Sequence, residues 1–129
     1  MSSRHQYFVA ENPQQWLGKV VGNGHCVALV QAAAKAPHTS LWRAAGDLRM
    51  WDNLEPGLVI ATFQDDRYQN RTNGDSHAAL LLAVRDDGIE VIDQWVGQPT
   101  HTRVIRWEGT TPANSASAYS VVIALMPDD

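Results

Sequence analysis

The chain has 129 residues, of which 44% are hydrophobic and 19% charged, and its formal net charge at pH 7 is −4. This length and composition are typical of one globular domain with a proper core, which we expect to span residues 1–129. The acidic balance and the scattered arginines exclude nucleic-acid binding, and no apolar run approaches the roughly 20 residues that cross a membrane.

The first half of the chain predicts helices. Asn12-Pro13 is a helix-start signal for a short helix over 13–20. The residues from Val27 to Ala36 are largely helix formers and predict a second helix, which Pro37 stops. A third helix is expected over 40–50. The apolar positions that suggest its period are Leu41, Trp42, Ala45 and Leu48.

After the turn at Pro56-Gly57 the chain changes character and predicts strands. The five expected strands are residues 58–63, 77–84, 89–95, 102–107 and 120–126. Helices followed by a strand meander indicate an α+β fold, in which N-terminal helices pack on a roughly five-stranded antiparallel sheet.

The only cysteine, Cys26, follows the turn Gly22-Asn23-Gly24 and His25, and stands at the start of the second predicted helix. A lone cysteine is more often a small buried apolar residue than a nucleophile. At a helix start, however, the unpaired backbone N–H groups and the positive end of the helix dipole favour the thiolate. The position therefore indicates a nucleophile.

A base for this nucleophile is available at His77, which follows Gly74 and opens an apolar strand. A helix-start cysteine followed by a strand-start histidine is typical of papain-like hydrolases, and a base within reach is what a catalytic thiol needs. The polar segment 64–76 leads directly into His77. Long loops in compact domains are usually functional or mobile, so we expect this segment to form one wall of the cleft.

The candidate for the third group, which would orient the imidazole, is Asp93 on the next strand. A three-residue hairpin loop over 86–88 would place His77 and Asp93 on one face but set Asp93 opposite Leu81, roughly 13 Å from His77 along the strand. A wider loop or a bulge would bring the two together. A two-residue Asp-Gly turn would put them on opposite faces.

Two other possible motifs, a dinucleotide-binding fingerprint and a zinc site, do not match the sequence. Gly22-x-Gly24 before a helix lacks the third glycine of a dinucleotide fingerprint, and no alternation of strands and helices follows. The five histidines and one cysteine do not have the spacing of a zinc site. The expected chemistry therefore requires no metal and no cofactor.

At these positions the chain resembles the CHAP family, the cysteine, histidine-dependent amidohydrolases and peptidases. Its three motifs are Asn23-Gly24-His25-Cys26, Gly74-x-x-His77-Ala78-Ala79 and Val91-Ile92-Asp93-Gln94-Trp95. The segment from Trp42 to Gly46, followed by 56–63 and Tyr68, is similar to the small peptidoglycan amidase effectors of type VI secretion systems. The resemblance covers roughly residues 16–125.

The resemblance implies that Cys26 is the nucleophile, His77 the base and Asp93 the orienting acid of a papain-like amidase. The expected substrate is an amide bond in a peptidoglycan stem peptide or cross-link. CHAP domains often carry Glu at the third position and a polar residue beyond it, so Gln94 is a second candidate for that role. Asn23 or the Cys26 backbone N–H would supply the oxyanion hole.

The effector resemblance also implies a protein partner and a destination. Such effectors are paired with an immunity protein that blocks the cleft. The first 20 residues lack the apolar region of a signal peptide, so we expect synthesis in the cytoplasm and delivery by a secretion system to the periplasm of a recipient cell.

Three alternatives stay open at this point. The first is a housekeeping or phage cell-wall hydrolase with the same chemistry. The second is a papain-like acyltransferase or deamidase that acts on protein or lipid. The third is a non-enzymatic binding domain in which Cys26 is buried and inert.

Overall fold

The structure of the chain is a computed structural model that describes residues 2–128. Its strands are β1 (Ser2–Tyr7), β2 (Arg43–Asp47), β3 (Leu58–Thr62), β4 (Ala78–Arg85), β5 (Gly88–Trp95), β6 (Gln98–Arg106) and β7 (Tyr119–Asp128). Its one α-helix within these residues is α1 (Cys26–Ala34). Its short 3₁₀ turns are η1 (Pro13–Trp16), η2 (Thr39–Leu41), η3 (Leu48–Met50), η4 (Pro112–Asn114) and η5 (Ala116–Ala118).

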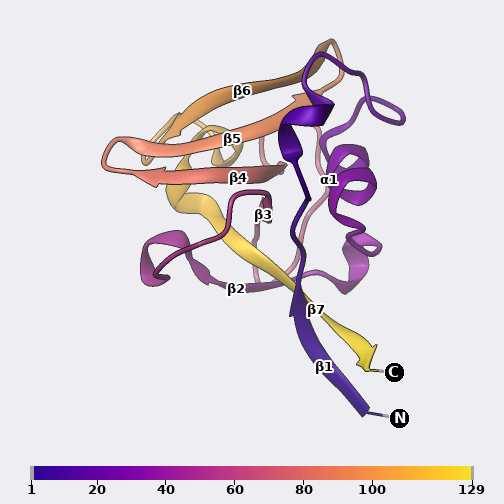
Figure 1. Cartoon of the computed structure of the whole chain (residues 1–129). Helices are drawn as coiled ribbons and strands as arrows, with labels where there is room; N and C mark the ends of the chain where they lie inside the picture. Colours follow the sequence, from indigo (N-terminus) through magenta and orange to yellow (C-terminus); the bar gives the residue numbers. More distant parts are fainter. Residues whose placement is uncertain (1, 129) are drawn as a thin grey trace.

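The strands form one antiparallel sheet in the order β1-β7-β3-β4-β5-β6, and β2 also pairs with β7. The four strands β3 to β6 are the predicted meander, and β7 returns to pair with β3. The paired strands β1 and β7 extend away from the body of the molecule, so the two ends of the chain lie side by side (Figure 1).

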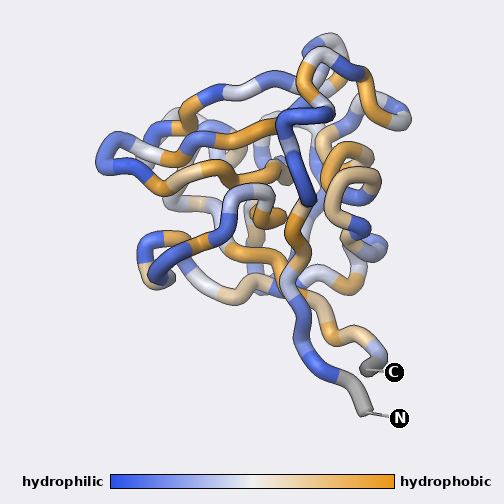
Figure 2. The backbone as a smooth tube through the Cα atoms, in the orientation of Figure 1, coloured by the Kyte–Doolittle hydropathy of each residue, from blue (hydrophilic) through white to orange (hydrophobic). Residues whose placement is uncertain are grey.

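The sheet has apolar side chains on both faces because its central strands alternate between two buried clusters. On one face α1 packs over β3, β4 and β5, where Val59, Leu80 and Ile92 meet Leu29 of the helix. On the other face Ile60, Leu81 and Val91 pack with residues from η3, η5 and β7. Figure 2 shows the hydrophobic colour concentrated in α1 and the central strands, whereas the turn joining β4 and β5 is hydrophilic.

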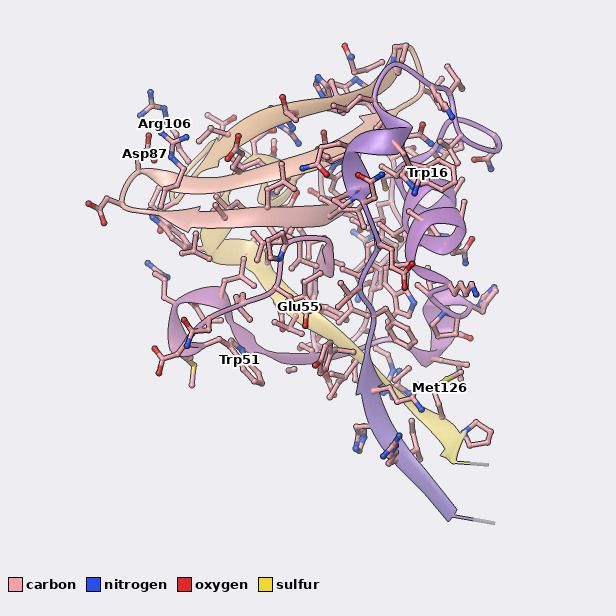
Figure 3. All side chains as sticks on the ribbon, in the orientation of Figure 1. Trp16, Trp51, Glu55, Asp87, Arg106 and Met126 are labelled. Carbon is pink, nitrogen blue, oxygen red and sulfur yellow. The ribbon has the colours of Figure 1, made fainter. Side chains whose placement is uncertain are left out.

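The predicted helix over 13–20 is wrong beyond its first turn. The chain forms only the 3₁₀ turn η1 and then leaves the helical path at Leu17, which has ψ 135°, and Gly18, which has φ +83°. The Gly18 N–H donates to the Thr100 carbonyl at 2.8 Å instead of to a helical partner, so contact with the β5–β6 hairpin overrides the local preference. Trp16, at the end of η1, packs beside the α1 core (Figure 3).

The predicted helix over 40–50 is also wrong, because this segment forms β2 between two 3₁₀ turns. Arg43 pairs with Ile123 and Ala44 with Val122 of β7. The apolar residues that suggested one helical face are divided between the two faces of the sheet: Trp42 joins the α1 side and Leu48 the opposite side, both fully buried. Within residues 2–128 the N-terminal half thus contributes one α-helix rather than three, and the sheet has seven strands rather than five.

The candidate active-site cleft

The Cys26 side chain stands at the first residue of α1, where the sequence predicts it. Two positive-φ glycines, Gly22 and Gly24, turn the preceding loop, and a Cβ at Gly22 would lie only 2.9 Å from the Ala28 Cβ. The Asn23 side-chain oxygen accepts from the His25 N–H at 3.0 Å and tightens the same loop. The thiol therefore stands at the N-terminal end of α1, where the first N–H groups of a helix lack partners within the helix.

His77 lies immediately before β4 and its side chain is buried. Two backbone contacts with Thr62 at the end of β3 hold it: the His77 N–H donates to Thr62 Oγ1 and the Thr62 N–H donates to the His77 carbonyl, each at 3.0 Å. The histidine is therefore positioned by the end of a strand pair rather than by the loop that precedes it.

A β-bulge sets the register that brings Asp93 to His77. The hairpin between β4 and β5 turns at Asp86-Asp87, with Arg85 opposite Gly88. Pairing then shifts by one residue at Leu82, so that Leu81 faces Val91, and Asp93 does not lie opposite Leu81. Continuing this register places Asp93 opposite Ala79 and therefore on the same face as His77. Without the extra residue, the two side chains would point to opposite faces.

Asp93 is fully buried and is the centre of a charged cluster. Its Oδ2 atom lies 2.7 Å from His77 Nε2 and accepts from Arg103 Nε at 2.9 Å. Its Oδ1 atom lies 3.0 Å from His101 Nε2, out of line for a hydrogen bond. A buried carboxylate is stable only when cationic groups compensate for its lost hydration, and here His77 and Arg103 do so.

The electrostatics of the cluster favour an ion pair between the thiol and the imidazole. Burial by itself would raise the pKa of the Cys26 thiol, but hydrogen bonds from His77, Tyr68 and the Ala78 backbone, with the charge on His77, outweigh burial and lower it. Burial would lower the pKa of His77, yet its contacts with Asp93 and Cys26 raise it to about 9. Because Nε2 of His77 is engaged by Asp93, Nδ1 is left for the thiol.

The pKa of the Asp93 carboxyl is also set by burial acting against nearby hydrogen bonds and charges. Burial would raise its pKa, but the hydrogen bond with His77 and the charges on His77 and Arg103 lower it, so the group is ionised. Trp95 covers the cluster: its ring makes edge contacts with the His77 and His101 rings, and the Arg103 guanidinium lies 5.0 Å from its centroid. This indole shields the ion pairs from water and strengthens them.

Cys26 and His77 both line a cleft of about 310 Å³. The loop 64–76 forms one wall, as the sequence predicts, and η4 and the end of β5 form others. The remaining lining residues are His25, Arg71, Thr72, Gly74, Ser76, Trp95, Val96, Arg103, Ala113 and Asn114. A thiol, an imidazole and an adjacent open space are the parts that acyl transfer requires.

Gln94 lies on the opposite face of β5 from Asp93 and does not contact His77. Its amide oxygen accepts from the Val21 N–H at 2.9 Å and the Thr100 hydroxyl at 3.2 Å. Its amide nitrogen donates to the carbonyls of Val21 and His25, each at 2.9 Å. The side chain therefore ties the loop before Cys26 to the strand that carries Asp93.

Sequence reasoning assigned no site role to three residues that contact Asp93 or Cys26: His101, Arg103 and Tyr68, of which it named Tyr68 only in the resemblance. His101 pairs with Asp93 across β5 and β6, and Arg103 pairs with Val91 on the same face. The hairpin signal at Gly97 could have placed these residues near Asp93, but pairing also shifts between Asp93 and Trp95, which no local pattern announces. The Tyr68 hydroxyl lies 3.5 Å from Cys26 Sγ.

Within residues 2–128, no group of three or more His, Cys, Asp or Glu side chains is placed to hold a metal ion. No helix in this part of the chain is long and apolar enough to cross a membrane.

The chain is similar to known amidase effectors. The family described as domesticated amidase effector 2 matches residues 1–122. The type VI secretion amidase effector 2 protein of Salmonella typhi is 36% identical, and the match covers 79% of this chain and 87% of that protein. The solved structure of type 6 secretion amidase effector 2 (Tae2) matches with a TM-score of 0.76 at 33% identity, covering 88% of this chain and 92% of the other.

Proposed function

The chain belongs to the domesticated amidase effector 2 family, and from that premise we propose that it is a cysteine amidase that hydrolyses amide bonds in peptidoglycan stem peptides or cross-links. In this proposal Cys26 is the nucleophile, His77 the general base and acid, and Asp93 the group that orients His77. The protein acts as an antibacterial effector that a type VI secretion system delivers to the periplasm of a recipient cell, and a cognate immunity protein blocks its cleft.

The mechanism is acyl transfer. The thiolate of Cys26 attacks the amide carbonyl carbon, the S–C bond forms and the carbonyl π electrons move to oxygen. Backbone N–H groups at the start of α1 stabilise this oxyanion. The oxyanion collapses, the C–N bond breaks and the protonated His77 gives its proton to the leaving nitrogen. Water, deprotonated by His77, then hydrolyses the thioester.

One observation supports this assignment above the others, namely the chain of contacts from thiol to imidazole to carboxylate. His77 lies between the Cys26 thiol, whose pKa is lowered, and the fully buried Asp93 carboxylate, whose Oδ2 atom is 2.7 Å from His77 Nε2. The thiol and the imidazole also border an open cleft. A structural cysteine in a core would have a raised pKa and no such partners. The arrangement therefore favours catalysis over the reading of Cys26 as an inert buried side chain.

The direct test is digestion of purified peptidoglycan with the wild type and with Cys26→Ala, followed by identification of the fragments by mass. We expect the wild type to release peptide fragments and the alanine variant to release none while keeping the circular dichroism spectrum of the wild type. Thr102→Ala, which changes an exposed side chain on β6, is the matched control and should remain active. Substantial turnover by Cys26→Ala would exclude the cysteine mechanism.

The place of action separates this proposal from an acyltransferase or deamidase. Expression in a Gram-negative cytoplasm should be tolerated, because peptidoglycan is absent there. Fusion to a periplasmic signal should cause lysis that depends on Cys26 and His77. Equal toxicity in both compartments would indicate a cytoplasmic substrate instead.

A further inference from the structure

The thiol of Cys26 has a second side-chain partner besides His77. The Tyr68 hydroxyl lies 3.5 Å from Sγ, which is hydrogen-bond distance for sulfur. Tyr68 comes from the loop 64–76, whereas His77 lies immediately before β4 and is held by the end of β3, so the two partners are positioned by different parts of the chain. The mechanism described above makes no use of this phenol.

The Tyr68 ring is fixed in place by the core. It packs against the indole of Trp42 with centroids 5.0 Å apart and an interplanar angle of 54°. Trp42 is fully buried, and its indole N–H donates to the Pro37 carbonyl at 3.0 Å. Just before Tyr68, the backbones of Gln64 and Arg67 exchange two hydrogen bonds of 3.0 Å that close a tight turn. The hydroxyl is therefore held beside Sγ by a preformed scaffold.

The Tyr68 hydroxyl approaches Cys26 Sγ from the core of the protein rather than from the cleft. Tyr68 does not line the cleft beside Cys26, and it packs with the α1 side of the core. Burial, together with the nearby charge of Cys26, raises the pKa of Tyr68 far above its ordinary value, so the hydroxyl keeps its proton throughout the pH range of the reaction. Toward a thiolate, a protonated phenol acts only as a donor.

We propose that Tyr68 is a catalytic residue whose hydroxyl donates a hydrogen bond to the Cys26 thiolate and fixes the sulfur on the side facing His77. This inference rests on the proposed cysteine mechanism and adds a second, non-titrating stabiliser of the nucleophile. His77 must give up its proton to the leaving nitrogen during each turnover, whereas Tyr68 exchanges none. When the S–C bond forms, the charge leaves the sulfur and the phenol stays in place to receive the thiolate again.

The test compares Tyr68→Phe with the wild type, because phenylalanine keeps the ring on Trp42 and removes only the hydroxyl. The rate of alkylation by iodoacetamide is measured against pH in the folded protein, and its midpoint reports the pKa of Cys26. Hydrogen bonds to charged groups are worth enough to shift a pKa by about one pH unit, so we expect the midpoint to rise by about that amount. Tyr7→Phe, at an exposed tyrosine on β1, is the matched control and should leave the midpoint unchanged.

Peptidoglycan digestion against pH is the second readout. In Tyr68→Phe, the pH at which kcat/KM rises on the acidic side should increase by the same amount as the alkylation midpoint. At higher pH, kcat/KM of the variant should approach the wild-type value. An unchanged midpoint would overturn the role of Tyr68. A drop in kcat at every pH with an unmoved midpoint would overturn it too, since that pattern indicates lost packing. If Cys26→Ala is inactive in the same assay, either failure concerns Tyr68 alone; if Cys26→Ala is active, the cysteine mechanism itself has failed.

Discussion

Asp93→Asn tests what sets the charge state of His77. The substitution keeps the shape of a fully buried side chain and removes the negative charge that lies 2.7 Å from His77 Nε2. Burial lowers the pKa of His77, but the hydrogen bond with Asp93 and the contacts with Cys26 reverse that effect and raise the pKa to about 9. Without the carboxylate we expect the pKa of His77 to fall back toward its ordinary value near 6.5.

The stabilisation linked to protonation of His77 follows from the difference between its pKa in the folded and unfolded states. A span from about 6.5 in the unfolded chain to about 9 in the folded protein corresponds to about 3 to 4 kcal/mol, at roughly 1.4 kcal/mol per pH unit. Because the folded pKa is the higher one, this stabilisation is fully present below about pH 6.5 and is lost as the pH rises through 9. Burial opposes this rise and Cys26 supplies part of it, so the figure is the net stabilisation of the protonated imidazole rather than the contribution of Asp93 alone.

The assay is the free energy of unfolding in urea at several pH values between 6 and 9.5. The comparison is made in a Cys26→Ser background, because the lowered pKa of the thiol gives stability that increases with pH in the same window. With Asp93 present, stability should fall as the pH rises; in Asp93→Asn the slope should be much flatter.

Asp87→Asn is the matched control, since Asp87 is an exposed carboxylate in the turn between β4 and β5 (Figure 3). It should preserve the slope of the parent. If Asp93→Asn shows the same pH slope as its parent, the contact between His77 and Asp93 does not set the pKa of His77. The orienting role assigned to Asp93 would then have to be abandoned.

Three further outcomes are expected. Gln94→Met should lower the free energy of unfolding by about 3 kcal/mol in urea denaturation, because it leaves buried backbone groups of Val21 without partners; an effect below about 1 kcal/mol would mean that water replaces the amide. Gly57→Ala should cost about 2 kcal/mol or more by the same measurement, since Gly57 has φ +97° and a Cβ there would meet the Ala10 carbonyl oxygen at 2.3 Å. Arg71→Gln, at the cleft wall, should raise KM for a carboxylate-bearing peptidoglycan peptide more than kcat changes, whereas Arg67→Gln on the same loop should not; equal effects would exclude a substrate contact at Arg71.

Local sequence was sufficient to place Cys26 and the meander strands. The turn glycines, the helix formers and the stop at Pro37 lie within about fifteen residues of one another, so the start of α1 follows from short-range preferences. The five predicted strands all occur in the structure, because runs of β-branched and apolar residues between turn residues favour strands through local preferences alone. The same preferences located His77 at the opening of β4.

Long-range pairing decided the rest. The segment after Trp42 becomes β2 rather than a helix because β7, far along the chain, offers it a partner, and no local pattern contains that information. The contact between His77 and Asp93 depends on one extra residue in β4 at Leu82, which shifts the register and selects the face. A bulge has no sequence signature of its own, so the sequence supplied the reacting groups and only the pairing of whole strands brought them together.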